Sequence, residues 1–201
     1  MGDDAKFWND CYADGKTGWD RGEVHPALTR LMKMGLLRSP ASIVVPGCGR
    51  GYEVVELAKN GFDVTAIEIA NEPVKYLQQR LDEFKLTAEV VQKSIFEFQP
   101  TKPVDFVYEQ TCLCAIDPKL RTKYEQTVYN WLKPDGELFV LFAQTGRPGD
   151  GPPFHCSSEE MQVVFPESRW IWVAKNSPGR FEHPSGKLFE LAHILMKRSN
   201  T

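Results

Sequence analysis

The sequence predicts an α/β fold of the Rossmann-like, doubly wound kind, in which helices cover both faces of a largely parallel sheet. Short β-branched runs alternate along the chain with segments of helical periodicity, which is the pattern of successive βαβ units. The run 42–45 breaks directly into glycines at positions 47, 49 and 51, and a helix-like segment follows. Glycines suit such a corner because they allow unusual φ angles and let a ligand approach the main chain closely.

The next predicted strand, 63–69, places a carboxylate near its end. Glu68 follows Gly47 by 21 residues. In nucleotide-binding βαβ units an acidic residue caps the ribose hydroxyls at an offset of about 20 residues. A glycine-rich turn alone can be an ordinary loop, but the spaced carboxylate favours a ligand that contains adenosine.

The spacing of the glycines indicates which adenosine cofactor to expect. A dinucleotide pyrophosphate usually lies over G-x-G-x-x-G at a helix N-terminus. This chain has G-x-G-x-G followed by the bulky Tyr52, which suits a ligand without phosphate. S-adenosylmethionine is such a ligand, and an NAD-dependent oxidoreductase is the alternative that this spacing disfavours.

Length and composition are those of an ordinary soluble domain. A chain of 201 residues is expected to form a single domain over 1–201, and a net charge of −3 without any basic run argues against nucleic acid as a partner. No apolar run reaches the ~20 residues that a membrane span needs. The five cysteines form no C-x-x-C pair, so we expect free thiols, no metal site and a cytoplasmic monomer with a small-molecule substrate.

Residues 1–22 are predicted to form an N-terminal arm rich in aromatic side chains, among them Trp8, Tyr12 and Trp19. One interpretation is a fixed strut that docks its aromatics on the core. The other is a lid over the cofactor, because indole faces can surround a sulfonium cation while excluding water. The polar, glycine-containing background of the arm favours the lid.

Capping and turn signals place the remaining helices. Pro26 is suited to the first turn of a helix that stops near Gly35, and Gly61 ends the helix after the glycine corner. Asn71 is expected to cap a helix to Phe84. Further signals are Asp117-Pro118, which opens a helix to Trp131, and the capping-box spacing at 157–160, which starts a helix to Val164.

The remaining strands are predicted at 88–92, 104–108, 137–142, 170–174 and 188–195, with a turn at 133–136. Ligands of doubly wound sheets lie outside the carboxyl ends of the strands, so Ser94 and Ile95 are expected near the adenine. By the same argument the exit of 104–108, with Gln110, faces the methyl-transfer centre. The Gly- and Pro-rich stretch 146–154 is a loop and a candidate substrate wall.

Several stretches together resemble the thiopurine S-methyltransferase family, with the closest likeness to its plant branch of halide and thiol methyltransferases. The likeness is collinear over nearly the whole chain. The stretches are 45–49, the arm from Trp8 to Trp19, 114–118, 132–138 and 151–154. The resemblance implies a class I S-adenosylmethionine-dependent methyltransferase fold, with a seven-stranded mixed sheet.

The resemblance also assigns the cofactor contacts. It implies that the arm aromatics touch the cofactor, that the glycine corner underlies its amino-acid portion, that Glu68 holds the ribose and that two residues flank the adenine. Tyr12 stands where the family usually has Trp, and Gln110 stands where relatives show Tyr or Arg near the cofactor and acceptor. The implied cofactor-binding residues are Trp8, Tyr12, Trp19, Gly47, Gly49, Glu68, Ser94, Ile95 and Gln110.

The acceptor is expected to be a small sulfur or halide nucleophile, such as a thiol, hydrosulfide, thiocyanate or iodide. Gln110 carries no charge to anchor a large anionic aromatic acceptor, and Phe154 with its neighbouring prolines would supply an apolar wall. Arg147 is the nearby cation that could reverse this preference. A larger aromatic thiol and a cofactor-binding module without catalysis stay open as alternatives.

The sequence shows no convincing catalytic triad, and no catalytic residue is assigned. Methyl transfer from a sulfonium is an in-line displacement that mainly requires alignment and desolvation. His155 could assist from beside the Gly/Pro loop, but an exposed structural histidine is the preferred interpretation.

Overall fold

The structure of the protein is a computed structural model that describes residues 4–173 and 179–199. The start of the predicted arm, 1–3, and position 174 of a predicted strand lie outside the described residues. The helices are α1 Ala5–Ala13, α2 Pro26–Lys33, α3 Tyr52–Lys59, α4 Asn71–Phe84, α5 Arg121–Trp131 and α6 Ser158–Val164, with short 3-10 helices η1 Ile95–Glu97, η2 Leu113–Ala115 and η3 Pro118–Leu120. The strands are β1 Ser42–Pro46, β2 Asp63–Glu68, β3 Glu89–Gln92, β4 Val104–Glu109, β5 Leu132–Gln144, β6 Trp170–Trp172, β7 Gly179–Glu182 and β8 Phe189–Lys197.

The strands form one mixed sheet in the order β3-β2-β1-β4-β5-β8-β6, and β7 pairs with β8 beside this path. β1 to β5 run parallel, whereas β8 is antiparallel to β5, β6 and β7. The predicted seven-stranded mixed sheet is thus confirmed, with β7 as an eighth short strand. The order reverses between β1 and β4, so the ligand crevice of such a sheet is expected at their carboxyl ends.

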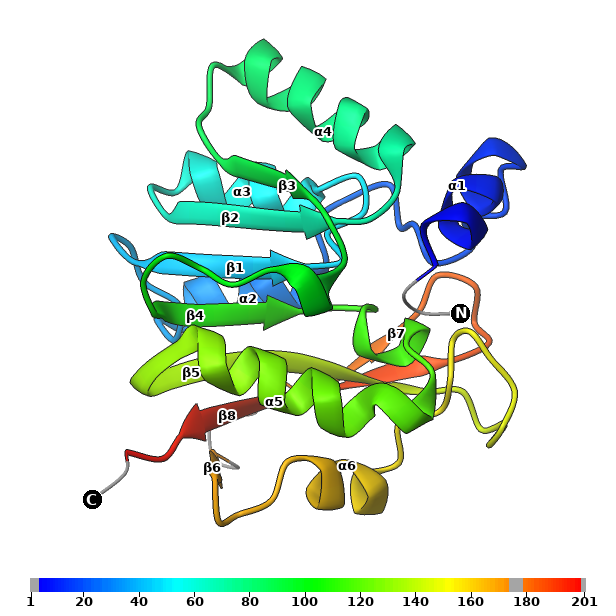
Figure 1. Cartoon of the computed structure of the whole chain (residues 1–201), viewed down its shortest axis with the longest axis vertical. Helices are drawn as coiled ribbons and strands as arrows, with labels where there is room; N and C mark the ends of the chain where they lie inside the picture. The colour runs from blue at the N-terminus through cyan, green and yellow to red at the C-terminus, as the bar shows by residue number, and fades with distance from the viewer. Residues whose placement is uncertain (1–3, 174–178, 200–201) are drawn as a thin grey trace.

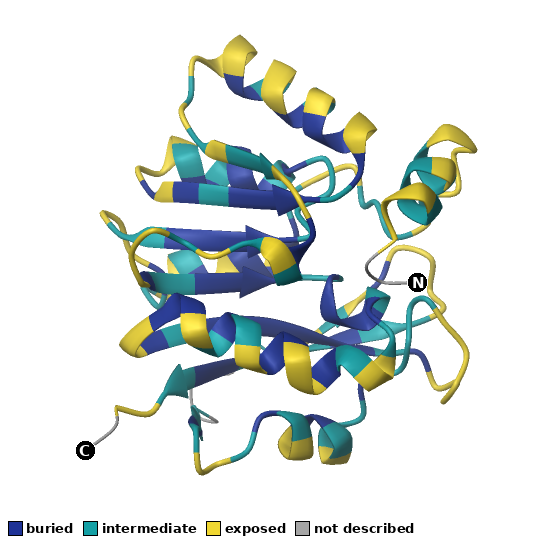
Figure 2. Ribbon diagram, in the orientation of Figure 1, coloured by how far each residue is buried: buried dark blue, intermediate teal, exposed yellow. Residues whose placement is uncertain are grey.

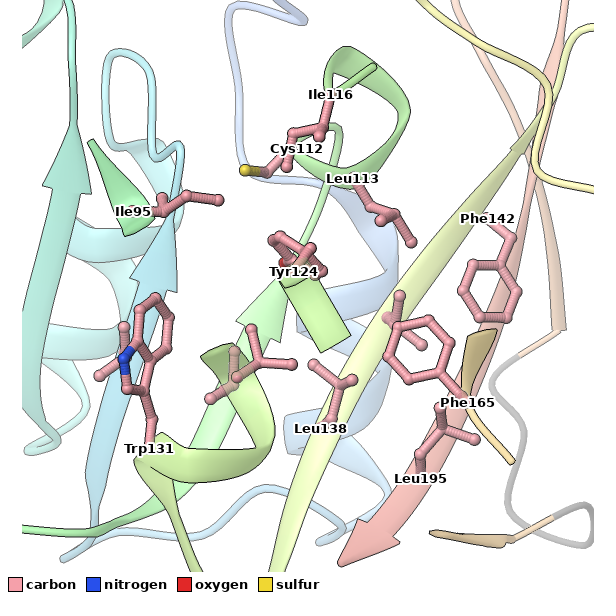
Figure 3. Close-up of a cluster of buried hydrophobic side chains, with 14 of the residues drawn as sticks. Ile95, Cys112, Leu113, Ile116, Tyr124, Trp131, Leu138, Phe142, Phe165 and Leu195 are labelled. Atoms are coloured by element: carbon pink, nitrogen blue, oxygen red, sulfur yellow. The ribbon is translucent and has the colours of Figure 1, made fainter. Parts of the chain in front are cut away.

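Helices cover both faces of the sheet, because alternate strand residues point to opposite sides. Ile43 and Val45 of β1 pack with α2, α3 and α4, whereas Val44 packs with α5 and α6. Figure 2 shows the buried strands between helices whose outer turns are exposed. The α5 side of the core gathers large side chains such as Tyr124 and Trp131 around the middle strands (Figure 3).

Four local features differ from the sequence-based expectation. Residues 5–13 form the helix α1, within the stretch that was predicted only as an aromatic arm. The predicted turn 133–136 is instead a bulged part of β5, with Asp135 at a φ of 60°. Asp117 caps the 3-10 helix η3, and α5 begins only at Arg121. Asn71 is the first residue of α4, and the N-cap position belongs to Ala70, which has no capping side chain.

In the described part of the chain, no helix combines the length and the apolar character that crossing a membrane requires. The carboxyl ends of β1, β2 and β4 all face the side of the molecule that carries α1 and the loop after β5 (Figure 1). The candidate site lies at this end of the sheet.

Candidate functional site

The glycine corner after β1 has the unusual φ angles that its sequence predicts. Gly47, Gly49 and Gly51 have φ values of 56°, 53° and 70°, in the left-handed region that favours glycine. A Cβ atom at Gly47 would lie 2.9 Å from Cys112 Sγ, and one at Gly49 would lie 3.3 Å from the Tyr12 hydroxyl. Both the backbone conformation and the close neighbours therefore require glycine at the corner.

Glu68 ends β2 directly beside this corner and is only 7% exposed. Its Oε2 accepts the N–H of Gly49 at 2.9 Å, and its Oε1 accepts the N–H groups of Ile69 at 2.7 Å and Ala70 at 2.8 Å. Burial raises the pKa of Glu68, and the three N–H donors act in the opposite direction. The Glu68 carboxylate thus connects the glycine corner to the start of α4. The sequence predicts that the same carboxylate holds a ribose.

A cavity of about 590 Å³ opens between the corner, the arm and the loop after β5. This volume is in the range of pockets that enclose one organic ligand, roughly 300 to 1,000 Å³. Ile95, Cys112 and Ile116 line it and also belong to the core cluster, so its floor continues into the packed interior (Figure 3). The lining includes all the predicted cofactor-binding residues: Trp8, Tyr12, Trp19, Gly47, Gly49, Glu68, Ser94, Ile95 and Gln110.

The arm is docked over this cavity. Trp19 packs edge-to-face with Trp8 and with Tyr12, with ring centroids 5.3 Å and 5.7 Å apart. Asn9 Oδ1 accepts the N–H of Asn71 at 2.8 Å, which supplies the cap that α4 lacks. Burial raises the pKa of the Tyr12 hydroxyl, so this group stays protonated at neutral pH. The aromatic cluster thus lies where the sequence predicts a lid.

We expect limited proteolysis to distinguish a lid from a fixed strut. Gly15 and Gly18 lie in an exposed stretch after α1, and α1 itself has no buried residue, so little apolar area holds the arm in place. Cleavage near these glycines should slow strongly when S-adenosylmethionine is added. Equal cleavage with and without the cofactor would support the strut.

The loop after β5 is fixed by a buried arginine. Arg121 is 1% exposed and donates to Glu160 Oε1 at 2.5 Å and to the carbonyl of His155 at 3.0 Å. His155 Nδ1 accepts the N–H of Thr145 at 3.0 Å. His155 is half-buried, not exposed as expected, and it does not line the cavity.

The predicted acceptor wall is partly wrong. Pro152 and Pro153 line the cavity, but Phe154 does not. The ring of Phe154 packs so closely on Gly151 that a Cβ there would lie 2.4 Å from it, and the Phe154 N–H donates to the carbonyl of Cys114 at 2.6 Å. The ring therefore packs within its own loop, and the prolines supply the apolar wall.

A buried polar cluster of Arg21, His25, Glu53 and Glu190 was not predicted from the sequence. Ala27 N donates to His25 Nδ1 at 3.0 Å, so the ring proton is on Nε2 and is directed at Glu190 Oε2, 2.8 Å away. His25 is therefore a neutral donor. Arg21 Nη1 lies 3.7 Å from the same carboxylate oxygen, and Glu53 Oε1 accepts the N–H of His25 at 2.8 Å.

Glu190 lies within the strand predicted at 188–195 and was not singled out, although a lone carboxylate in an apolar strand is costly to bury without partners. His25 directly precedes Pro26 of the predicted helix, and Arg21 lies within the predicted arm 1–22, so neither was assigned to a site. Among the described residues, no group of three or more His, Cys, Asp or Glu side chains is arranged to hold a metal ion.

Comparisons with known proteins agree with this geometry. Residues 3–180 match the family model of thiopurine S-methyltransferase. Thiocyanate methyltransferase 1 of Arabidopsis thaliana is 30% identical over 163 residues, covering 79% of this chain and 70% of that protein. A thiopurine S-methyltransferase of Legionella pneumophila (strain Corby) is 28% identical over 206 residues, covering 92% of this chain and 90% of that protein.

A solved structure supports the fold. The 1,6-didemethyltoxoflavin-N1-methyltransferase of Burkholderia thailandensis, solved with bound S-adenosylhomocysteine, superposes with a TM-score of 0.77 at 20% identity, covering 97% of this chain and 87% of that chain. The family model spans most of the sequence, and the cavity lies where the glycine corner and Glu68 place it. The chain therefore belongs to the thiopurine S-methyltransferase family of S-adenosylmethionine-dependent methyltransferases.

Proposed function

We propose that this protein transfers the methyl group of S-adenosylmethionine to a small, soft nucleophile such as a thiolate, hydrosulfide, thiocyanate or iodide. The family membership supports methyl transfer from this cofactor, and relatives include proteins named for thiocyanate and for thiol substrates. The choice among acceptors rests on the chemistry of the cavity.

The observation that carries the proposal concerns the buried glutamates that line the cavity and the one histidine among its described lining residues. All of them already make hydrogen bonds within the protein. Glu53, Glu68 and Glu190 each already accept a hydrogen bond from a protein N–H group. Burial lowers the pKa of His183, and its Nδ1 accepts the N–H of Ser185 at 3.2 Å. These groups are engaged in the fold, so an acceptor that needs a strong general base, such as an amine or alcohol, fits poorly.

Soft anions do not need that base. A free thiol has a pKa of about 8.5 and is partly ionised near neutral pH, and iodide and thiocyanate are anions throughout. The lone pair of the nucleophile forms the new bond to the methyl carbon as the carbon–sulfur bond of the sulfonium breaks, which leaves S-adenosylhomocysteine. No proton transfer is required for an acceptor that is already ionised.

The residues of the chain would act by binding, orienting and desolvating. The glycine corner and Glu68 would hold the amino-acid and ribose portions, and Trp8, Tyr12 and Trp19 would surround the sulfonium and exclude water. Pro152 and Pro153 face the same cavity from the loop after β5. An apolar wall strips water from a soft anion and so raises its reactivity.

An acceptor panel with labelled S-adenosylmethionine tests this proposal. We expect a higher kcat/KM for hydrosulfide, simple thiols, thiocyanate and iodide than for an aromatic thiopurine. Among the halides, iodide should be preferred to chloride, because chloride is more strongly hydrated and costs more to desolvate. Methyl transfer to amine or alcohol acceptors alone would contradict the proposal.

The competing acceptor is a larger aromatic thiol. Arg147 lines the cavity and is exposed at its rim, where it could reach an anionic ring substituent. If a thiopurine is the better substrate and Arg147→Ala abolishes that activity, the loop after β5 sets specificity and the small-acceptor proposal is wrong.

A further inference from the structure

Unsatisfied polar atoms gather around the cavity. In the described residues, seven buried side-chain nitrogen or oxygen atoms have no hydrogen-bond partner. Four of the seven belong to residues that line the cavity: Arg21 Nε, Arg50 Nε, Tyr108 Oη and Gln110 Oε1. A buried donor without a partner is costly, and in native proteins it calls for an explanation such as a ligand.

Arg21 has the largest deficit of hydrogen bonds in this group. Its guanidinium carries five N–H donors, and its side chain is only 8% exposed. Nε has no partner, and both Nη atoms reach the carbonyl of Glu182 only at 3.5 Å, the outer limit of a hydrogen bond. The contact to Glu190 at 3.7 Å is an ion pair rather than a hydrogen bond. Several donors of a permanent cation are therefore left for a further partner.

The charged groups around Arg21 are compatible with a bound anion. Glu190 already faces the Arg21 cation and the N–H of neutral His25. Burial raises the pKa of Glu53, which already accepts the N–H of His25, and burial lowers the pKa of His183. Burial, followed by the nearby Glu53, raises the pKa of Tyr108 well above its ordinary value, so its hydroxyl stays a donor.

The position of these donors matches the acceptor side of the reaction. Tyr108 lies near the carboxyl end of β4, and Glu190 pairs in register with Ala143 at the end of β5. The predicted cofactor residues Gly47, Glu68 and Ser94 instead follow or end β1, β2 and β3. The Arg21 and Tyr108 donors therefore lie in the part of the cavity beside β4 and β5. The predicted cofactor residues named above lie in the part beside β1, β2 and β3.

We propose that the Arg21 guanidinium and the Tyr108 hydroxyl form a subsite that binds the anionic methyl acceptor beside the cofactor. This inference rests on the proposed transfer to a small nucleophile and deepens it, because it assigns the charge of the acceptor and the residues that position it. Arg21 supplies the compensating charge, and Tyr108 supplies a directional hydrogen bond.

The test uses thiocyanate, which is an anion at every relevant pH, and the whole 201-residue chain saturated with S-adenosylhomocysteine. Calorimetry should show one thiocyanate bound by the wild type. Arg21→Gln should weaken this binding at least about tenfold and Tyr108→Phe by roughly three- to tenfold, because each removes a donor to a charged group. In the methylation assay the same variants should raise the KM for thiocyanate more than they lower kcat.

Tyr124→Phe is the matched control. Tyr124 is fully buried like Tyr108 and its hydroxyl also lacks a partner, but Tyr124 does not line the cavity. Thiocyanate binding should be unchanged in this variant. If Arg21→Gln does not fold, Tyr108→Phe decides the question, since it removes only a hydroxyl that bonds to nothing else.

The outcomes separate this inference from the proposed function. If thiols and thiocyanate are methylated and both variants bind thiocyanate like the wild type, the function stands and the subsite is wrong. If thiocyanate binds and the variants lose it but no small acceptor is methylated, the subsite stands and the proposed acceptor class is wrong. A wild type that binds no thiocyanate overturns the subsite.

Discussion

Glu68→Ala is expected to weaken the binding of S-adenosylmethionine by roughly 1.5 to 3 kcal/mol, because it would remove the charge-assisted hydrogen bonds that we predict between this carboxylate and the ribose. The structure adds a second reason. The carboxylate accepts three backbone N–H groups, from Gly49, Ile69 and Ala70, and so holds the glycine corner against the start of α4. Calorimetry with S-adenosylmethionine and S-adenosylhomocysteine would measure the loss.

Glu68→Gln separates the two effects. The amide retains one oxygen that can accept from Ile69 and Ala70, but it carries no charge and presents an NH₂ group toward Gly49. We expect an intermediate affinity with a thermal stability closer to that of the wild type. A folded Glu68→Ala protein with wild-type affinity would show that the ribose assignment is wrong.

Glu109→Gln is expected to make the protein more stable at pH 8 and to reduce the pH dependence of its stability. Glu109 ends β4 and is fully buried, with Oε1 accepting the N–H of Leu113 at 2.8 Å and Oε2 without a partner. Burial raises the pKa of this carboxyl group from 4.5 to about 8. A neutral glutamine keeps the acceptor and removes the charge that burial disfavours.

The sign of the pH dependence follows from this shift. Between pH 4.5 and 8 the folded protein holds a proton on Glu109 that the unfolded chain releases. The free energy of unfolding should therefore fall as the pH rises through this window, by up to ~5 kcal/mol at about 1.4 kcal/mol per pKa unit. The effect is complete once the pH exceeds the folded pKa.

Denaturant unfolding from pH 5 to pH 9 would measure this effect. The wild type should lose stability with rising pH, and Glu109→Gln should lose much less. Glu97→Gln is a suitable control, because Glu97 is exposed in η1. Parallel pH profiles for the wild type and Glu109→Gln would mean that Glu109 is ionised in the folded protein and that its burial costs less than the structure indicates.

Local signals explain why the cofactor side of the site could be predicted from the sequence. The glycine corner needs φ values that only glycine readily adopts, and Glu68 follows at the offset set by one βαβ unit. Helix α1 was missed although Phe7, Trp8, Cys11 and Tyr12 have helical spacing, because the segment was interpreted as a polar, glycine-containing arm and not as a regular element. Strand β7 was missed because it has four residues, begins with Gly179 and lies close to Pro184.

The proposed acceptor side depends on contacts between distant parts of the chain. His25 and Glu190 are 165 residues apart in the sequence, and only the pairing of β8 with β5 brings them together. No single segment contains a pattern for that contact. Phe154 was misplaced for a related reason, since the packing of its ring on Gly151 depends on the path of the loop and not on its composition.

The contact between Asn9 and Asn71 makes the N-terminal arm a cooperative part of the domain. Helix α4 has no side-chain cap of its own, and its first N–H is satisfied by Asn9 from α1. Release of the arm would free that N–H, and a missing cap typically costs ~1 kcal/mol. Ala70, the residue before α4, donates its N–H to Glu68. If S-adenosylmethionine binds as predicted, the Asn9 amide connects the arm beside the sulfonium to the carboxylate beside the ribose, and opening of the arm is expected to weaken both contacts.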